Sequence, residues 1–255
     1  MRYIPLLIIF FSCIFFRDVE AQVTTANPSA NESKAVKAIR AAYDFQKKLD
    51  DSTTTIDRVI VKWSSTANDP DVKNDPNSLA IALGSEGLLE IRNGNAMRAD
   101  SLLKKSMPLF RSRMSKASFL VGYAELERSL LKNAMAMRAY DEIVNTMDSV
   151  GALWDIQFYR LSGYAPYAYA IDACFGMEQI ASSDTAFRKK AIDLLTQTMN
   201  RHTTDALGLM AIVSLHQLGA MSNETYKFQV DLLCSRKPEL RKACDTFEKK
   251  FSDGK

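Results

Sequence analysis

The feature that most constrains the fold is an internal similarity between two segments of the chain. Residues 79–107 and 119–147 align at an offset of 40 residues without a gap. The clearest match is the run Ala-Met-Arg-Ala, which occupies 96–99 in one segment and 136–139 in the other. Self-similarity at a fixed period of this length is typical of repeat architectures. In both segments apolar residues recur at steps of three and four, so each predicts a helix, a short turn and a second helix.

The remaining sequence also predicts an all-α fold. Glycine (10) and proline (7) are scarce, whereas sheet-rich folds need many turns and use more of both. We expect an N-terminal helical hairpin over residues 31–66, followed by a linker over residues 65–78. Asp75 and Pro76 there are typical of a helix N-cap and first helical residue. The helical repeat domain is expected to span residues 76–255.

Within that domain two looser hairpins follow the similar pair. Their predicted helices cover residues 164–180 and 184–199, then 205–218 and 223–233. Residues 239–251 predict a polar capping helix, which arrays of repeats need at their ends. Net charge is only +3 without a large basic cluster, so a nucleic-acid partner is not predicted.

The two central segments resemble the tetratricopeptide repeat. That family places a Leu-Gly pair in its first helix, and a small residue in its second helix with a large one four positions later. The matching residues here are Leu83-Gly84 and Tyr123-Ala124 for the pair, then Ala99 with Leu103 and Ala139 with Ile143. The chain departs from the family because its period is 40 rather than 34 residues and the leading tryptophan is absent. The resemblance implies hairpins stacked as a right-handed solenoid or as a compact helical array.

The resemblance also implies a concave face, lined by the first helices of successive hairpins, that binds a peptide or a partner's helix. On this chain the face would include Tyr123, Glu127, Tyr164, Tyr167 and Tyr169. The last three belong to residues 164–170, where small and aromatic residues alternate, and tyrosine suits recognition because it joins apolar area to a polar tip. The alternative is that these rings pack in the core between hairpins.

The N-terminus predicts export. Arg2 precedes an apolar run over residues 4–16, which is too short for a comfortable membrane span but fits a signal peptide. Val19 and Ala21 place small residues before a cleavage site after Ala21, so residues 1–21 would be removed. Residues 22–30 would form a disordered leader, and the protein would be periplasmic or secreted. An uncleaved anchor and a lipid anchor at Cys13 are the alternatives, although the residues before Cys13 match the lipoprotein box poorly.

Few residues point to chemistry. His202 and His216 are the two histidines, and no metal-binding, phosphate-binding or nucleophile motif is present, so we predict no enzyme, no metal and no cofactor. Cys234 and Cys244 could pair, or they could be small buried residues. The methionines at 97, 107, 137 and 147 fall at repeat-related positions, and we expect them to fill the core.

These observations favour an exported helical-repeat scaffold or adaptor that binds a protein or peptide. A second hypothesis is a periplasmic small-ligand-binding or transport-associated protein with a tyrosine-lined pocket. A third is an enzyme whose carboxylates converge only in space, which would place clustered carboxylates of perturbed pKa in a cleft.

Overall fold

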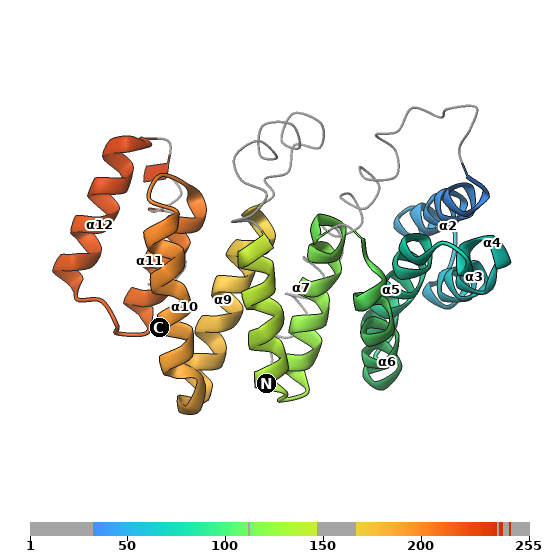
Figure 1. The fold of residues 1–255 in the computed structure, drawn as a ribbon, viewed down its shortest axis with the longest axis horizontal. Helices are drawn as coiled ribbons and strands as arrows, with labels where there is room; N and C mark the ends of the chain where they lie inside the picture. Colours follow the sequence, from blue (N-terminus) through green and yellow to red (C-terminus); the bar gives the residue numbers. More distant parts are fainter. Residues whose placement is uncertain (1–32, 112, 147–166, 239, 242–244, 246–255) are drawn as a thin grey trace. The chain divides into compact units, whose positions relative to one another are not determined.

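The computed structural model describes residues 33–111, 113–146, 167–238, 240–241 and 245 (Figure 1). Over these residues the chain is all-α, and its helices pack in adjacent antiparallel pairs, which confirms the predicted fold class. The chain divides into two compact units. Of the described residues, those up to 127 belong to the first unit and those from 128 onward belong to the second.

The first unit begins with the predicted N-terminal hairpin. Helix α2 (Lys34–Asp50) starts where the Ser33 hydroxyl accepts a hydrogen bond from the Val36 amide at 3.3 Å, and α3 (Ile56–Asn68) returns alongside it. Trp63 on α3 is fully buried, and its indole N–H donates to Gln46 Oε1 at 2.5 Å. The two helices pack against each other through their apolar faces, which confirms the predicted hairpin.

The predicted linker over residues 65–78 is wrong for most of its length. Helix α3 continues to Asn68, and a further short helix, α4 (Pro70–Lys73), follows directly. Asp69 begins α4, since its carboxylate accepts hydrogen bonds from the amides of Asp71 and Val72. The fully buried Val72 then ties the segment to the core. A polar, proline-containing stretch therefore forms helix because its acidic residues act as caps.

The next hairpin is formed by α5 (Pro76–Arg92) and α6 (Ala96–Ser106), and the 3-10 helix η1 (Met107–Leu109) follows it. The Asp75 carboxylate accepts from the Ser78 amide at 3.3 Å, which confirms the predicted cap. Helix α5 packs against α2, α3 and α4 as well as α6, so most of its residues are buried. A Cβ atom at Gly87 would lie 2.9 Å from Leu103 Cγ, so glycine allows α5 and α6 to pack this closely.

Helix α7 (Arg113–Ser129) is followed by a helix over residues 133–146. Glycines on both α5 and α7 bring these two first helices together. A Cβ atom at Gly84 would lie 2.6 Å from the Phe119 ring, and one at Gly122 would overlap Leu88. Small residues thus serve two interfaces, one within the α5–α6 hairpin and one between neighbouring first helices.

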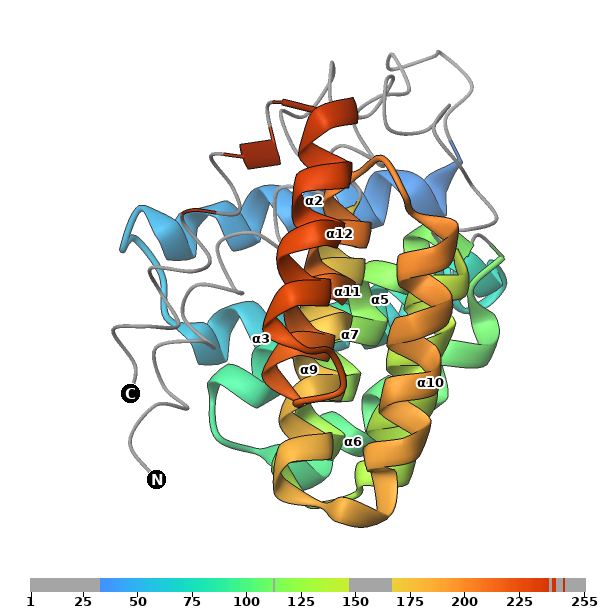
Figure 2. The same ribbon diagram turned by 90° about the vertical axis from the view of Figure 1, so that its left-hand side faces the viewer.

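The described part of the second unit contains that helix and two further hairpins. They are α9 (Tyr167–Ser183) with α10 (Thr185–Arg201), and α11 (Ala206–Gln217) with α12 (Asn223–Arg236). Helix α11 packs against α9, α10 and α12, as Figures 1 and 2 show, and nine consecutive residues from Leu207 to Leu215 are buried. Both hairpins were predicted, with boundaries displaced by a few residues.

The internal similarity does not translate into exact structural equivalence. In the first hairpin the second helix begins at Ala96, whereas in the next it begins at residue 133, three residues before the position that the alignment gives. Ala99 and Leu103 are buried, and so are Ala139 and Ile143, as the repeat pattern predicted. The matched methionines differ. Met137 is fully buried, but Met97 is 87% exposed, so the prediction that Met97 fills the core is wrong.

Several predictions fall on residues that the structure does not describe. They are the signal peptide over 1–21, the leader over 22–30, Cys13, Cys244, most of the capping helix over 239–251, and Tyr164. These remain predictions. No helix in the described part of the chain is long and apolar enough to cross a membrane.

Candidate functional site

The residues predicted to line a binding face lie in the interior wherever the structure describes them. Tyr123 is 7% exposed, Tyr169 is 4% exposed and Glu127 is fully buried. Tyr167 begins α9, but its side chain lies outside the described residues, as does all of Tyr164. The structure brings Tyr123 and Glu127 together, because they are four residues apart on α7 and share one face of that helix.

Tyr123 and Glu127 meet a charged strip on α6. Lys104 Nζ lies 3.6 Å from Glu127 Oε1, and it donates to Asp100 Oδ2 at 2.8 Å. Burial, followed by the nearby carboxylates of Glu127 and Asp100, raises the pKa of Tyr123 far above its usual value. The phenol therefore stays neutral, and the half-exposed Lys104 supplies positive charge beside a buried carboxylate.

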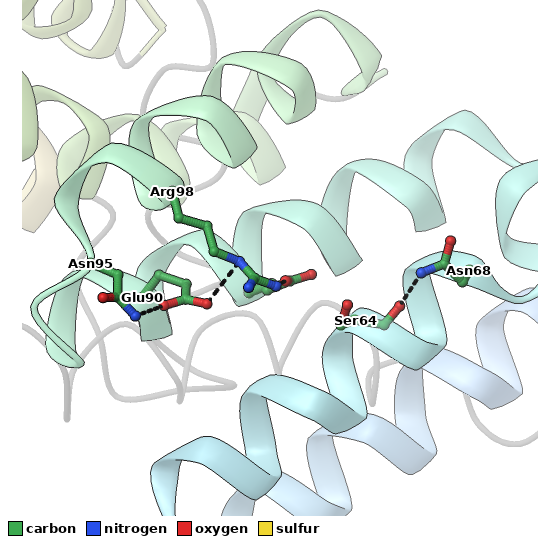
Figure 3. A network of polar contacts seen from close by, with 6 residues as sticks. Ser64, Asn68, Glu90, Asn95 and Arg98 are labelled. Atoms are coloured by element: carbon green, nitrogen blue, oxygen red, sulfur yellow. Dashed lines mark hydrogen bonds and ion pairs between the residues drawn. The ribbon is translucent and has the colours of Figure 1, made fainter.

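A second polar cluster lies on the other side of α6, against α5. Glu86 and Glu90 are each 2% exposed, and their spacing of four residues places both carboxylates on one helical face. Arg98 reaches across from α6, with Nη2 donating to Glu86 Oε1 at 2.6 Å and Nε lying 2.9 Å from Glu90 Oε1. Figure 3 shows the Arg98 guanidinium reaching toward the Glu90 carboxylate.

The cap of α6 completes this cluster. Asn95 Nδ2 donates to Glu90 Oε2 at 2.6 Å, so the turn that starts α6 is joined to the buried carboxylate (Figure 3). The hydrogen bond to Glu86 raises the pKa of Arg98 above its usual value, which keeps the guanidinium protonated. Buried charges are stable only when they are paired and hydrogen-bonded, and this network meets that condition.

In both clusters, basic side chains of α6 neutralise buried carboxylates of the neighbouring helices. Glu86, Glu90 and Glu127 are almost inaccessible to solvent, and basic side chains of α6 lie against all three. A general base or a nucleophile must reach its substrate, which these carboxylates do not in this arrangement. No group of three or more His, Cys, Asp or Glu residues in the described part of the chain could hold a metal ion.

Both histidines act in helix connections. His202 Nδ1 lies 2.8 Å from Asp205 Oδ2, while the other carboxylate oxygen of Asp205 accepts from the amides that start α11. His216 stacks on Tyr226 at 4.3 Å between ring centroids, and its Nε2 lies 2.7 Å from Asn223 Oδ1. Each histidine thus links the end of one helix to the start of the next.

The described cysteines are buried free thiols. Burial, together with the charge of Asp172, raises the pKa of Cys174 to about 12, so this thiol is protonated at neutral pH and is a poor nucleophile. Cys234 is likewise buried and free on α12. Both behave as small apolar residues of the core.

No role was predicted from the sequence for five residues of these clusters, namely Glu86, Glu90, Asn95, Arg98 and Lys104. A signal for the pair of glutamates was present, because two carboxylates four residues apart interrupt an otherwise apolar helix. Charged residues in such a position need a partner from a neighbouring helix. The aligned positions in the next hairpin are Leu126 and Leu130, which carry no charge. A comparison of the two similar segments therefore gave no indication of the network.

Comparison with known proteins does not assign a family. No protein-family model, no curated protein and no solved structure matches this chain.

One partly buried carboxyl group gives a pH-dependent prediction. Burial on α9 raises the pKa of Glu178, although the hydrogen bond that Ser182 Oγ donates at 2.9 Å opposes this shift. A carboxyl group whose pKa is higher in the folded state favours folding when protonated. This contribution to the free energy of unfolding is lost as the pH rises through the pKa of the folded state. We expect Glu178→Gln to raise the melting temperature at neutral pH and to leave it unchanged below about pH 4.

The measurement is circular dichroism melting of both proteins across this pH range. Glu142→Gln, which replaces an exposed carboxylate of the same unit, is the control. An equal gain from Glu178→Gln at both ends of the range would contradict the explanation, because the benefit would then not depend on the charge.

Proposed function

We propose that this chain is an exported helical-repeat scaffold or adaptor that binds a protein or peptide partner. The observation that carries the proposal is the packing of α5 with α6 and of α5 with α7 through glycines. Gly87 meets Leu103 in one interface, and Gly84 meets Phe119 in the other. This pairing of small and large residues is the packing that the tetratricopeptide resemblance implies, and in such arrays function lies in exposed faces rather than in a reactive centre.

The charged clusters support a structural role of this kind. The bonds from Arg98 to Glu86 and Glu90, and the position of Lys104 beside Glu127, fix both sides of α6 to its neighbours. A framework held in this way presents its outer side chains in a fixed geometry, which lowers the entropic cost of binding a partner. The proposal has three further parts: the protein is exported, its hairpins are of the tetratricopeptide kind, and residues 164–170 contact the partner.

The test is capture of partners by the chain in its native host after mild cross-linking, with mass spectrometry of what is captured. We expect one stoichiometric protein that is lost when Tyr164 and Tyr167 are both replaced by alanine. Phe228→Ala is the matched control, because Phe228 is a 63% exposed aromatic residue outside the tyrosine-rich segment. Enrichment of no protein above background would overturn the proposal. Native mass spectrometry for a bound small molecule would then test the alternative, a ligand carrier.

A further inference from the structure

Four hairpin turns share one backbone geometry, and one of them contains a large apolar residue at the position concerned. In each turn the second residue after the end of the first helix has a positive φ. These residues are Ser52 (φ 56°), Gly94 (φ 82°), Leu131 (φ 59°) and Gly219 (φ 65°). In each case the amide of that residue donates to the carbonyl group three residues earlier, at 3.2, 3.1, 3.0 and 2.9 Å respectively. The position suits glycine, because a side chain is strained in the left-handed region.

Leu131 is unfavourable at this position for a second reason. Its side chain is 84% exposed, so it gains little from packing against the rest of the protein. Glycine or asparagine would adopt the same turn at lower cost. Neither the stability of the turn nor the core explains a leucine here, and a strained residue of this kind suggests a role outside the chain.

Leu131 belongs to a small exposed apolar surface near basic residues. Met135, which is 36% exposed, lies in the first turn of the helix that follows. Asn133 Nδ2 donates to Asp184 Oδ2 at 3.1 Å, and this bond places the start of α10 beside the turn.

Helix α10 contributes more positive charge to this end of the second unit. Its first two turns carry Arg188, Lys189 and Lys190, all of them exposed. Arg188 donates to the carbonyl oxygen of Leu218, which joins the next hairpin turn to the same edge. The acidic residue at the start of α10, Asp184, is engaged by Asn133 and by the Ala186 amide. We call the residues Leu131, Met135, Lys189 and Lys190 the turn edge.

From this juxtaposition we propose that the turn edge binds the surface of a lipid bilayer that contains anionic phospholipids. Leu131 and Met135 enter the boundary between headgroups and acyl chains, while Lys189 and Lys190 face the phosphate groups. An apolar residue that projects from a turn, with basic residues beside it, matches the charge and polarity of such a surface. A protein interface would instead be expected to bury a broader area centred on aromatic or arginine side chains.

The test uses the chain from residue 22 onward, because the apolar run over residues 4–16 would itself bind lipid. All described helices lie within this part of the chain. We expect it to sediment with vesicles of phosphatidylcholine and phosphatidylglycerol, and to bind vesicles of phosphatidylcholine alone much more weakly. Raised salt concentration should weaken binding to the anionic vesicles, because the basic residues contribute through screened charges.

Leu131→Asn is the decisive variant. Asparagine tolerates a positive φ, so the melting temperature should stay the same or rise, while the affinity for anionic vesicles should fall by about tenfold or more. Replacing Lys189 and Lys190 by glutamate should also weaken binding. The control Phe228→Asn removes another exposed apolar side chain of the same unit, and it should bind as the parent chain does.

Two results would overturn the proposal. One is a parent chain that binds neither kind of vesicle, which would point to an acidic protein as the occupant of the turn edge. The other is a Leu131→Asn variant that binds anionic vesicles as tightly as the parent chain. Neither result bears on capture of a protein partner, so this inference and the proposed scaffold function can fail separately.

Discussion

Replacing Gly208 by alanine is expected to destabilise the second unit by about 3 kcal/mol or more, the upper range for overpacking a filled site. Gly208 lies in the first turn of α11, and a Cβ atom there would overlap the carbonyl oxygen of His202. The neighbour is backbone at the end of α10, so no side-chain rotation can relieve the clash. Helix propensity alone predicts the opposite sign, since alanine is favoured over glycine in a helix by about 1 kcal/mol.

The surrounding hydrogen bonds explain why the backbone cannot easily move. Asp205 Oδ1 accepts from the amides of Leu207 and Gly208 at 3.0 and 3.1 Å, while Asp205 Oδ2 lies 2.8 Å from His202 Nδ1. The His202 amide in turn donates to Thr198 O at 3.0 Å. Any shift that makes room for a methyl group must therefore disturb the ends of both α10 and α11.

Chemical denaturation followed by circular dichroism measures the loss, and hydrogen exchange locates it in α10 and α11. Gly219→Ala is the matched control in the same unit, because its cost comes from a positive φ rather than from overlap with backbone. We expect that control to lose about 1 kcal/mol. If Gly208→Ala were no more damaging than Gly219→Ala, the close approach of α11 to the His202 carbonyl would be refuted.

Replacing Arg98 by alanine is the second change with a large expected effect. It leaves Glu86 and Glu90, both 2% exposed, without the guanidinium that neutralises them. Removing one side of a buried ion pair typically costs 3–5 kcal/mol, because an uncompensated charge remains in the interior. We expect about 3 kcal/mol here, at the low end, since the Arg98 side chain is itself 55% exposed and solvent weakens the interaction.

A triple variant separates charge from packing. In Arg98→Ala with Glu86→Gln and Glu90→Gln, no unpaired charge remains, so most of the lost free energy of unfolding should return. Arg138→Ala is the control that the chain itself offers. Arg138 occupies the aligned position in the next hairpin and is exposed, and Leu126 and Leu130 stand where the first hairpin has its two glutamates.

We expect Arg138→Ala to change the free energy of unfolding by less than about 0.5 kcal/mol, as is usual for a surface residue. Denaturation curves of the four proteins decide the question. A triple variant that remains as unstable as Arg98→Ala would show that the arginine acts through packing of its aliphatic stem and not through its charge.

The sequence determined the helices and their order. Apolar spacing located the buried stripes of α2 and α3, and Asp75 with Pro76 marked the start of α5. The turns at Gly94 and Gly219 fall between predicted helices, where glycine adopts a positive φ without strain. These features are local, so they depend on residues a few positions apart and can be recognised in a single chain.

The sequence left the surroundings of the candidate site residues open. Tyr123, Glu127 and Tyr169 were expected on a binding face, with packing in the core as the alternative for Tyr169, and all three are buried. An aromatic residue near the start of an amphipathic helix has the same spacing whether its face meets solvent or another hairpin. The sequence pattern therefore could not distinguish the two environments, and only the packing of neighbouring helices did.

The internal repeat shows most clearly where the sequence stops being informative. The same Ala-Met-Arg-Ala run was visible in both segments, yet Met97 is exposed and Met137 is fully buried. The left-handed residue of the second turn is Leu131, three positions earlier than the alignment with Gly94 requires. The second helix then starts earlier, but the aligned Ala99 and Ala139 are both buried, so the two methionines differ because different neighbours cover the two helices. Local sequence determined the helices and their repeat. Tertiary packing determined at which residue each turn ends. It also determined which side chains lie in the core, in a charged network or on the surface.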